Sequence, residues 1–361
     1  MKLFSQKRSA LCLLILSAAA GALLFTFNTS LLWYWIFGLG FGYILQHSRV
    51  CFVSATTDPF LSDSTDQFRA ILIGILIASL GTSAIKYLSN GIYDTLGVSA
   101  VSIPLIFGAF IFGIGMVLAG CCCSGMFIRM GEGYSVHLIT FLCVIIGYCF
   151  ANTHYKLLWA PMIQNSPVIF FPEKLGWGLG VTANIVILLI FYIIASAKDK
   201  QTTENTNYLK GGICLGLLCI LHIILLRTPW SVSGAFYWIE DIFKKLFNGG
   251  FSAIIKCDSS CAPSLTVGLG TNLRNFGLLV GSLISALFST QFHFRKIQSR
   301  QQAAKSVIGG LLMGYGACIA GGCNITAFFV ATASLSLSGW VFMIALFIGA
   351  YVGIKLLYKF I

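Results

Sequence analysis

Charged residues are scarce in this sequence. They account for 9% of its 361 residues, and only 11 residues are Asp or Glu. A soluble domain normally carries about a quarter charged residues, so this composition cannot cover a surface that faces water. The shortage of acidic residues also leaves no paired intramembrane acids of the kind that proton relays use.

Redox and metal signatures are missing as well. The 13 cysteines include no C-x-x-C pair, the spacing typical of thiol–disulfide oxidoreductases. No cluster of Met or His accompanies them, as a soft-metal site would favour. Most cysteines lie in apolar stretches, where a free thiol behaves as a small hydrophobic side chain. Cys257 and Cys261 differ, since they lie in a polar loop and could form a disulfide in an oxidising compartment.

Long apolar runs, by contrast, are abundant. A helix needs about 20 residues to cross the hydrocarbon core of a bilayer, and several runs approach or reach that length. We therefore predict an all-α polytopic membrane protein. The runs cover residues 9–27, 70–87, 134–152, 176–197, 211–226, 273–290 and 337–358.

Lys and Arg gather in three short segments, at residues 2–8, 198–210 and 295–305. Short loops rich in these residues mark the cytoplasmic side of a membrane, so we expect all three segments to be cytoplasmic. The first segment and the apolar run after it are similar to a signal peptide, but no small-residue cleavage site follows Phe27. We therefore expect a retained first transmembrane helix.

An internal repeat joins two distant parts of the chain. Residues 106–128 read IFGAFIFGIGMVLAGCCCSGMFI, and residues 307–329 read VIGGLLMGYGACIAGGCNITAFF. Without a gap, the two stretches share Gly, Ala, Cys and Phe positions, including an Ala-Gly followed two residues later by Cys. Small residues do recur at helix interfaces, but this many matches favours duplication. Many transporters are built from such repeats, with the substrate site where the repeats meet.

Each repeat also predicts a helix that breaks and restarts. The Gly-rich run ends at Gly120 or Gly321, and Ser124 or Asn324 is suited to cap the helix that follows. A helix broken at membrane depth is tolerated where it lines a cavity. Its new N-terminus attracts anions, because unpaired N–H groups and the positive end of the helix dipole point outward there.

Residues 47–59, HSRVCFVSATTDP, form a third irregular segment. The segment is too polar for the middle of a lipid-facing helix. It is either a re-entrant loop, with Cys51 near its tip and Arg49 drawing anions, or an ordinary extramembrane loop with one buried cysteine. The sequence leaves both alternatives open.

Three motifs together resemble the YeeE/YedE family of membrane proteins that take up sulfur compounds, above all thiosulfate. They are RVCFVSA at 49–55, GIGMVLAGCCCSG at 113–125 followed by RMGEG at 129–133, and GGLLMGYGACIAGGCNI at 309–325. Their order is that of the thiosulfate-transporting, YeeE-like branch. The resemblance covers most of the chain after the first apolar run.

The resemblance implies an hourglass of about nine transmembrane helices plus short re-entrant helices, in two inverted pseudo-symmetric halves. It implies that Cys51, Cys122 and Cys323 line the path and pass thiosulfate by hydrogen bonding, with Cys122 central. Glu132 in RMGEG matches a recurrent family acid. A transporter of the bacterial inner membrane is implied, not an enzyme, with no cofactor or metal. A TusA-like cytoplasmic sulfurtransferase is its implied partner.

These considerations divide the chain into four parts. They are an N-terminal transmembrane helix at 1–29, a first repeat half at 30–155, a connecting segment with one transmembrane helix and a cytoplasmic loop at 156–210, and a second repeat half at 211–361. We expect residues 106–152 and 307–357 to superpose after a two-fold rotation about an axis in the membrane plane.

Thiols suit a path for thiosulfate, a dianion with one soft terminal sulfur. A neutral S–H group is a weak donor, and weak serial sites let an ion leave as well as enter. Burial among apolar side chains favours the neutral thiol. A Lys or Arg at the constriction would hold the dianion too tightly, and we expect none there. Only one of three consecutive side chains can face the path, so we expect Cys121 and Cys123 to be dispensable.

Other substrates and functions stay open. The family usually has Gly where this chain has Cys121, and Thr326 stands where the thiosulfate branch tends to have Gly. NITAFF at 324–329 is similar to a branch associated with selenium metabolism. A related sulfur or selenium compound is therefore an alternative substrate. A soft-metal permease, or a membrane thiol–disulfide oxidoreductase that uses Cys318 and Cys323, is an alternative function.

Overall fold

The computed structural model describes residues 2–199, 206–236 and 265–359. Helices make up nearly all of this described part, and its extended pairings are isolated bridges such as Phe170 with Ser336. The prediction of an all-α protein is therefore confirmed for the described residues. Cys257 and Cys261, and with them the question of a disulfide, lie outside these ranges.

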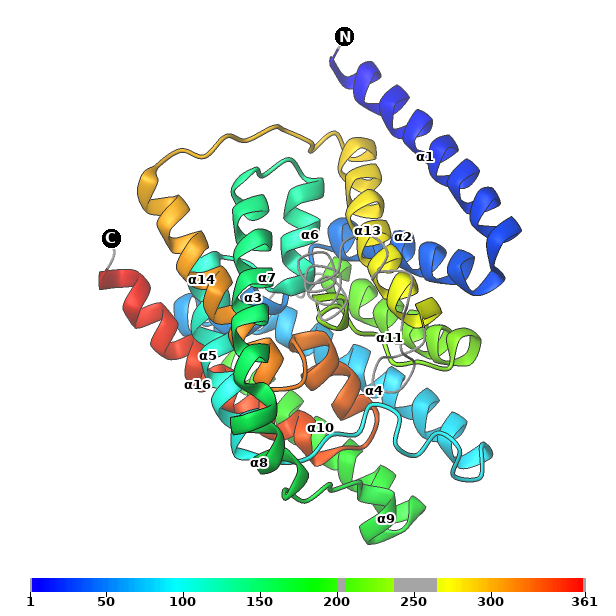
Figure 1. The fold of residues 1–361 in the computed structure, drawn as a ribbon, viewed down its shortest axis with the longest axis vertical. Coiled ribbons are helices and arrows are strands. Elements are labelled where there is room, and N and C mark those ends of the chain that lie inside the picture. Colours follow the sequence, from blue (N-terminus) through cyan, green and yellow to red (C-terminus); the bar gives the residue numbers. More distant parts are fainter. Residues whose placement is uncertain (1, 200–205, 237–264, 360–361) are drawn as a thin grey trace.

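The helices follow one another along the chain as Figure 1 shows. The first group is α1 (Lys2–Phe27), α2 (Thr29–Ser48), α3 (Phe52–Leu61), α4 (Asp66–Leu88), α5 (Ile103–Ala119), α6 (Cys123–Gly131) and α7 (Val136–His154). The middle group is η1 (Tyr155–Trp159), α8 (Ala160–Gln164), α9 (Phe171–Leu175) and α10 (Trp177–Lys198). The last group is α11 (Thr206–Leu226), α13 (Leu265–Phe288), α14 (Arg300–Ile319), η2 (Asn324–Val330), α15 (Ala331–Ala333) and α16 (Leu337–Lys359).

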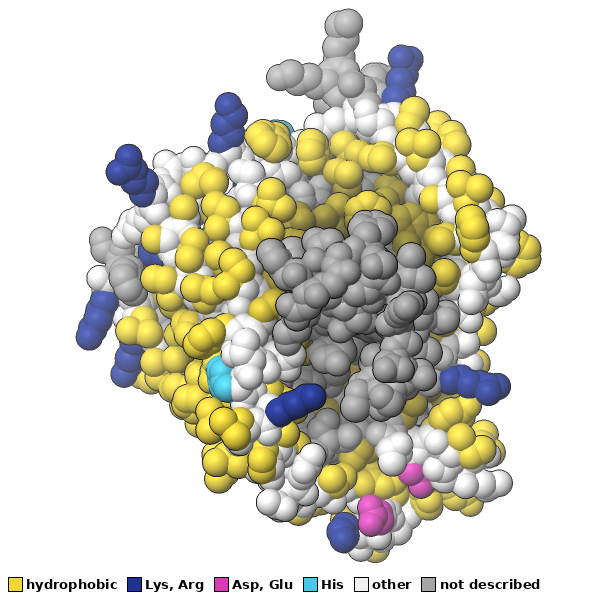
Figure 2. All heavy atoms as spheres, in the orientation of Figure 1, with side chains coloured by type: hydrophobic (Ala, Val, Ile, Leu, Met, Phe, Trp, Pro, Cys, Tyr) yellow, Lys and Arg dark blue, Asp and Glu magenta, His cyan; other side chains and the backbone are white. Residues whose placement is uncertain are grey.

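Hydrophobic side chains cover the outside of these helices. They occupy most of the described surface on the face shown in Figure 2, with Lys and Arg mostly near its edges. Leu23, Leu179 and Ile193, for example, each expose more than 60% of their surface. An apolar surface of this extent suits hydrocarbon rather than water.

Seven helices in the described part are long and apolar enough to cross a membrane, or eight if the bent pair of α14 with η2 and α15 counts as one span. The chain is therefore a multi-pass membrane protein. The number of about nine implied by the resemblance stays a prediction, as do the four parts into which the sequence was divided.

The long helices pack in pairs that join distant parts of the chain. α2 packs against α13 and α4 against α11, while α5 packs against α16 and α7 against α14. α5 and α14 also pack against each other. Suppose that α2, α4, α5 and α7 correspond, in this order, to α11, α13, α14 and α16. The contact of α2 with α13 then corresponds to that of α11 with α4, and the contact of α5 with α16 corresponds to that of α14 with α7. The two-fold relation between the halves remains a prediction that this pairing supports.

Glycines let the backbones of α5 and α14 approach closely. A Cβ added at Gly115 would lie 2.7 Å from the carbonyl oxygen of Gly309, and one added at Gly316 would lie 2.6 Å from the carbonyl oxygen of Gly108. In the repeat Gly108 matches Gly309, and Gly115 matches Gly316. The same close contact is thus made twice, and neither place has room for a side chain.

Both predicted helix breaks are present. α5 ends at Ala119 and is followed by Gly120 with a φ of 68°. α14 ends at Ile319, and Gly321 has a φ of 70°. This left-handed conformation favours glycine and commonly ends a helix. After the second break the chain bends by 46°.

The segment at 47–59 contains a helix. α2 ends at Ser48, Arg49 takes a left-handed conformation, and α3 begins at Phe52. Because α3 packs against α4 and α16 and most of its residues are buried, an ordinary extramembrane loop is wrong. Cys51 lies at the turn between α2 and α3, as the re-entrant alternative expects.

Replacement of Gly316 by Leu should destabilise the protein, because the α5 backbone occupies the space of the new side chain. Overpacking costs about 1–3 kcal/mol, and more where only backbone could move. Gly178→Leu is the matched control, since Gly178 is exposed on α10 with no neighbour within 4 Å. Thermal unfolding in detergent, followed by size-exclusion chromatography, measures both. Equal stability of the two variants would contradict the packing.

Candidate functional site

Cys51, Cys122 and Cys323 each stand directly before a short helix. They are the N-cap residues of α3, α6 and η2, and all three have extended backbones. The residue two positions before each cysteine is left-handed, with φ of 61° at Arg49, 68° at Gly120 and 70° at Gly321. One type of turn thus presents a thiol three times at a helix N-terminus, where backbone N–H groups lack a helical partner.

The thiol of Cys122 caps its own helix. Its Sγ accepts the N–H of Gly125 at 3.4 Å and lies 3.4 Å from the hydroxyl oxygen of Ser124. The assignment of Ser124 and Asn324 as capping residues is therefore wrong. The helices resume earlier, so Ser124 lies in the first turn of α6 and Asn324 is the first residue of η2.

Cys123 connects the two breaks. It is fully buried, and its thiol is a neighbour of the Cys323 thiol. Cys323 also lies near the Ser233 hydroxyl, and its Sγ is 4.0 Å from the hydroxyl oxygen of Thr326. The expectation that one thiol of the run faces the path, with Cys121 and Cys123 dispensable, stays a prediction.

Cys51 and Cys122 open into the same cavity. α2, the turn at 49–51 and α6 form its walls, which combine apolar side chains and the two thiols with five polar or charged side chains. The lining residues are Leu45, Gln46, Arg49, Val50, Cys51, Phe52, Cys122, Ser124, Gly125, Ile128, Arg129 and Glu132. The structure therefore brings Cys51 and Cys122 together in one cavity, while Cys323 is linked to them through Cys123.

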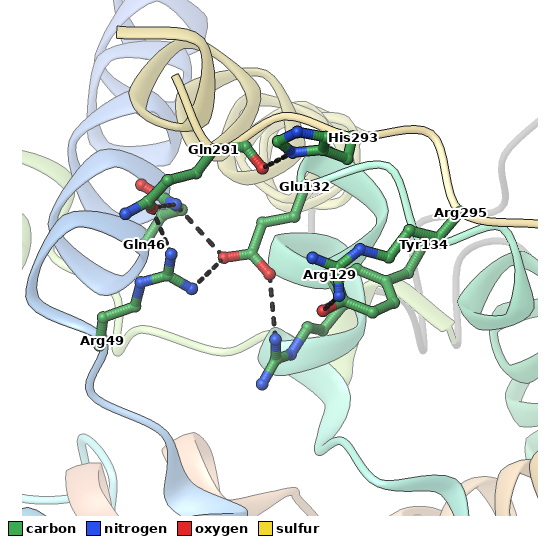
Figure 3. A network of polar contacts seen from close by, with 8 residues as sticks. All are labelled: Gln46, Arg49, Arg129, Glu132, Tyr134, Gln291, His293 and Arg295. Carbon is green, nitrogen blue, oxygen red and sulfur yellow. Dashed lines mark hydrogen bonds and ion pairs between the residues drawn. The ribbon is translucent and has the colours of Figure 1, made fainter. Parts of the chain in front are cut away.

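The carboxylate of Glu132 organises the mouth of this cavity (Figure 3). Its Oε1 accepts hydrogen bonds from Arg49 Nη1 at 2.8 Å and from Gln46 Nε2 at 3.2 Å, and its Oε2 accepts one from Arg129 Nη1 at 3.1 Å. The Glu132 side chain is 5% exposed, whereas those of Arg49 and Arg129 are 44% and 37% exposed. One buried carboxylate thus holds two guanidinium groups that still face solvent.

This cavity contains Arg49, which the re-entrant alternative expects to draw anions, and also Arg129, which the sequence analysis did not predict. Arg49 and Arg129 line the cavity into which the thiols of Cys51 and Cys122 open. The spacing of both arginines from the cysteines in the sequence indicates that they lie near the thiols. Arg49 precedes Cys51 by two residues, and Arg129 follows Cys122 by two helical turns and so shares its face of α6.

The Glu132 mouth lies on the side of the basic segments. The backbone carbonyl of Glu132 accepts the N–H of His293 at 3.4 Å, and that of Gly133 accepts the N–H of Arg295 at 2.8 Å. Gln6 Nε2 in turn donates to the carbonyl oxygen of Phe292 at 3.0 Å. Segments 2–8 and 295–305 therefore lie together, on the side that we expect to be cytoplasmic.

Cys318, the second thiol of the oxidoreductase alternative, packs in a small apolar cluster with Ala151 and Ile319. Cys323 has the Cys123 thiol as its neighbour instead. Across the described ranges, His, Cys, Asp and Glu do not gather in groups of three or more that could hold a metal ion.

Comparison with known proteins identifies relatives over most of the chain. The chain is 26% identical over 340 residues to the thiosulfate transporter TsuA of Spirochaeta thermophila. This match covers 89% of the chain and 97% of that protein. It is 25% identical over 350 residues to the thiosulfate transporter TsuA of Escherichia coli, covering 90% and 93% of the two chains.

A shorter match, 29% identical over 148 residues, is to the probable transporter YedE of Escherichia coli and covers 40% of this chain and 36% of that protein. The family model described as sulphur transport matches residues 47–352, a range that includes all three helix starts and the Glu132 mouth. The chain therefore belongs to the sulphur transport family.

Proposed function

We propose that this protein carries thiosulfate across the bacterial inner membrane, along a path lined by cysteine thiols and helix N-termini. The observation that carries the proposal is the placing of Cys51, Cys122 and Cys323 at three helix starts with the same preceding turn. Family membership supports it, as do two relatives named thiosulfate transporters that match 89% and 90% of the chain.

The chemistry of these sites suits a dianion with a soft terminal sulfur. Backbone N–H groups at a helix start attract the oxygens without a fixed charge. A neutral thiol beside them donates a weak hydrogen bond to the sulfur. Both interactions are weak one at a time, so the anion can exchange between successive sites.

Two of the helix starts meet at the centre of the molecule. Through the contact of Cys123 with Cys323, the N-termini of α6 and η2 lie together. α6 leads from there to Glu132. η2 and α15 lead to Leu335, whose carbonyl oxygen accepts the N–H of Phe171 at 3.0 Å. The segment before Phe171 lies near the start of α5, since the N–H of Val101 donates to the carbonyl oxygen of Pro167. Two positive dipole ends thus face one central position from opposite sides.

We propose that Glu132 adjusts the charge at one end of this path. Two guanidinium groups and one carboxylate leave a single net positive charge at the mouth, which draws a dianion but binds it less tightly than two free arginines would. Arg49 and Arg129 can turn from the carboxylate to the passing anion because both are partly exposed. When the anion leaves, Arg49 and Arg129 pair with Glu132 again.

Replacement of Cys122 by Ala should reduce labelled thiosulfate uptake by about tenfold or more, because a central site loses its donor and the cap of α6. Cys214→Ala is the matched control, since Cys214 is an exposed thiol on α11. Cys51→Ala and Cys323→Ala should impair uptake to a smaller degree, because backbone N–H groups remain at those sites.

Cells without other thiosulfate routes provide the measurement, with expression checked by immunoblot. Cys122→Ser sharpens the experiment, because a hydroxyl keeps a donor but suits the oxygens better than the terminal sulfur; we expect it to transport poorly. Normal uptake by well-expressed Cys122→Ala protein would contradict the proposed role of the thiol.

Replacement of Glu132 by Gln should slow uptake by about tenfold while binding to the purified protein becomes tighter, since a hydrogen bond to a charged group contributes about 1.5–3 kcal/mol. Glu173→Gln removes a carboxylate from the exposed helix α9 and serves as the control. Uptake rates and calorimetric binding together give the answer. Weaker binding in Glu132→Gln protein would show that the carboxylate does not compete with the anion.

The proposal extends to the architecture and to the partner. Inverted halves are supported by the exchanged helix pairs and by the doubled glycine contacts of α5 with α14. Delivery of the anion to a separate TusA-like sulfurtransferase on the cytoplasmic side stays a prediction. A selenium compound remains the alternative substrate, and uptake assays with selenite as competitor distinguish it from thiosulfate.

A further inference from the structure

Arg274 is a charged residue in the interior of the molecule that the sequence analysis left unassigned. It lies on α13, the helix that packs against α2, and only 1% of its surface is exposed. α13 continues from Arg274 to Phe288, which places Arg274 about 20 Å along the helix from the end that leads to the Glu132 mouth. It therefore lies close to the middle of α13, deep in the membrane and away from the Glu132 mouth.

Among the described residues, the guanidinium group of Arg274 has only neutral hydrogen-bond partners. Its Nη1 lies 2.8 Å from Nε2 of His222, and its Nη2 donates to the backbone carbonyl of Ser231. The other ring nitrogen of His222 lies 3.0 Å from the carbonyl oxygen of Thr228 and must carry the proton, so Nε2 accepts from Arg274 and the imidazole is neutral. Arg274 Nε is buried without a hydrogen-bond partner.

A buried arginine without a carboxylate is costly in a membrane protein. Desolvation of an unpaired ion costs several kcal/mol even after relaxation. Intramembrane charges of this kind usually mark the path of a substrate or ion. In the described part of the chain the ion pairs of the other arginines, such as Arg49 with Glu132 and Arg69 with Asp199, involve carboxylates. A bound anion would supply the negative charge that the described residues do not place beside Arg274.

Hydrogen bonds connect Arg274 to the thiol path. Ser231, whose carbonyl accepts from Arg274, receives a hydrogen bond on its side-chain oxygen from the Thr326 hydroxyl at 3.0 Å. Thr326 is in the first turn of η2, 4.0 Å from Cys323 Sγ. The segment at 231–233 thus lies between the guanidinium group and the helix start at Cys323.

We infer that Arg274, beside the Cys323 thiol and the Thr326 hydroxyl, forms an anion-binding site deeper in the membrane than Glu132, for a small divalent oxyanion of the thiosulfate class. The inference rests on the proposed function and adds a second charged site to the path. The site differs from the Glu132 mouth, because there a carboxylate neutralises part of the positive charge and here no carboxylate of the described residues does. An uncompensated charge favours capture, and a shared charge favours release.

Arg274→Gln tests the site, with Arg227→Gln as the matched control, because Arg227 is an exposed arginine that follows α11 beside the same segment. The concentration dependence of labelled thiosulfate uptake should show a KM about tenfold higher for Arg274→Gln and unchanged for Arg227→Gln, since loss of a charged hydrogen-bond donor weakens binding by about this factor. A KM within about twofold of wild type in well-folded Arg274→Gln protein would overturn the inference.

Two further measurements keep the inference separate from folding and from the proposed function. Arg274→Lys retains the charge but not the planar fork, so its KM should lie between those of wild type and Arg274→Gln; a wild-type KM would count against the site. Calorimetry with thiosulfate on the purified proteins decides the matter even if the wild type shows no uptake. Binding lost in Arg274→Gln and kept in Arg227→Gln supports the site, and equal binding in all three proteins refutes it.

Discussion

Backbone N–H groups inside a membrane need partners, because no water is present to supply them. This protein nevertheless starts three helices in its interior, at Cys51, Cys122 and Cys323. At Cys122 the thiol itself accepts one of the free N–H groups. The remaining donors can be satisfied by an anion, as the proposed path requires. The glycine contacts of α5 with α14 hold the two central starts in place.

Charge is distributed unequally along this path. At one mouth Glu132 holds Arg49 and Arg129, and both arginines stay partly exposed. Near the helix start at Cys323, Arg274 is buried with a neutral imidazole and a backbone carbonyl as partners. Between them lie thiols and helix starts without fixed charge. Along the proposed path, a dianion meets a shared, weaker positive charge at the Glu132 mouth and an uncompensated one near the helix start at Cys323.

The sequence predicted the helical membrane fold, both helix breaks and the family, because hydrophobic run length and the Gly-Cys repeat are local signals. It did not predict which residue caps each break, since Ser124 and Asn324 are better capping residues than cysteine on average. The contact of Cys123 with Cys323 joins residues 200 positions apart and has no local signature. Arg274 looked like any arginine in an apolar run, and only packing shows that its partners are neutral.

The position of a bound anion tests the central claim most directly. Selenosulfate carries selenium in place of the terminal sulfur of thiosulfate, and anomalous scattering from a crystal of its complex locates that atom. We predict selenium within about 4 Å of Cys122 Sγ, a usual donor–acceptor distance for sulfur, with the oxygens toward the first N–H groups of α6. Selenium bound only at Arg49 and Arg129 or only at Arg274, with none beside Cys122, would contradict the account.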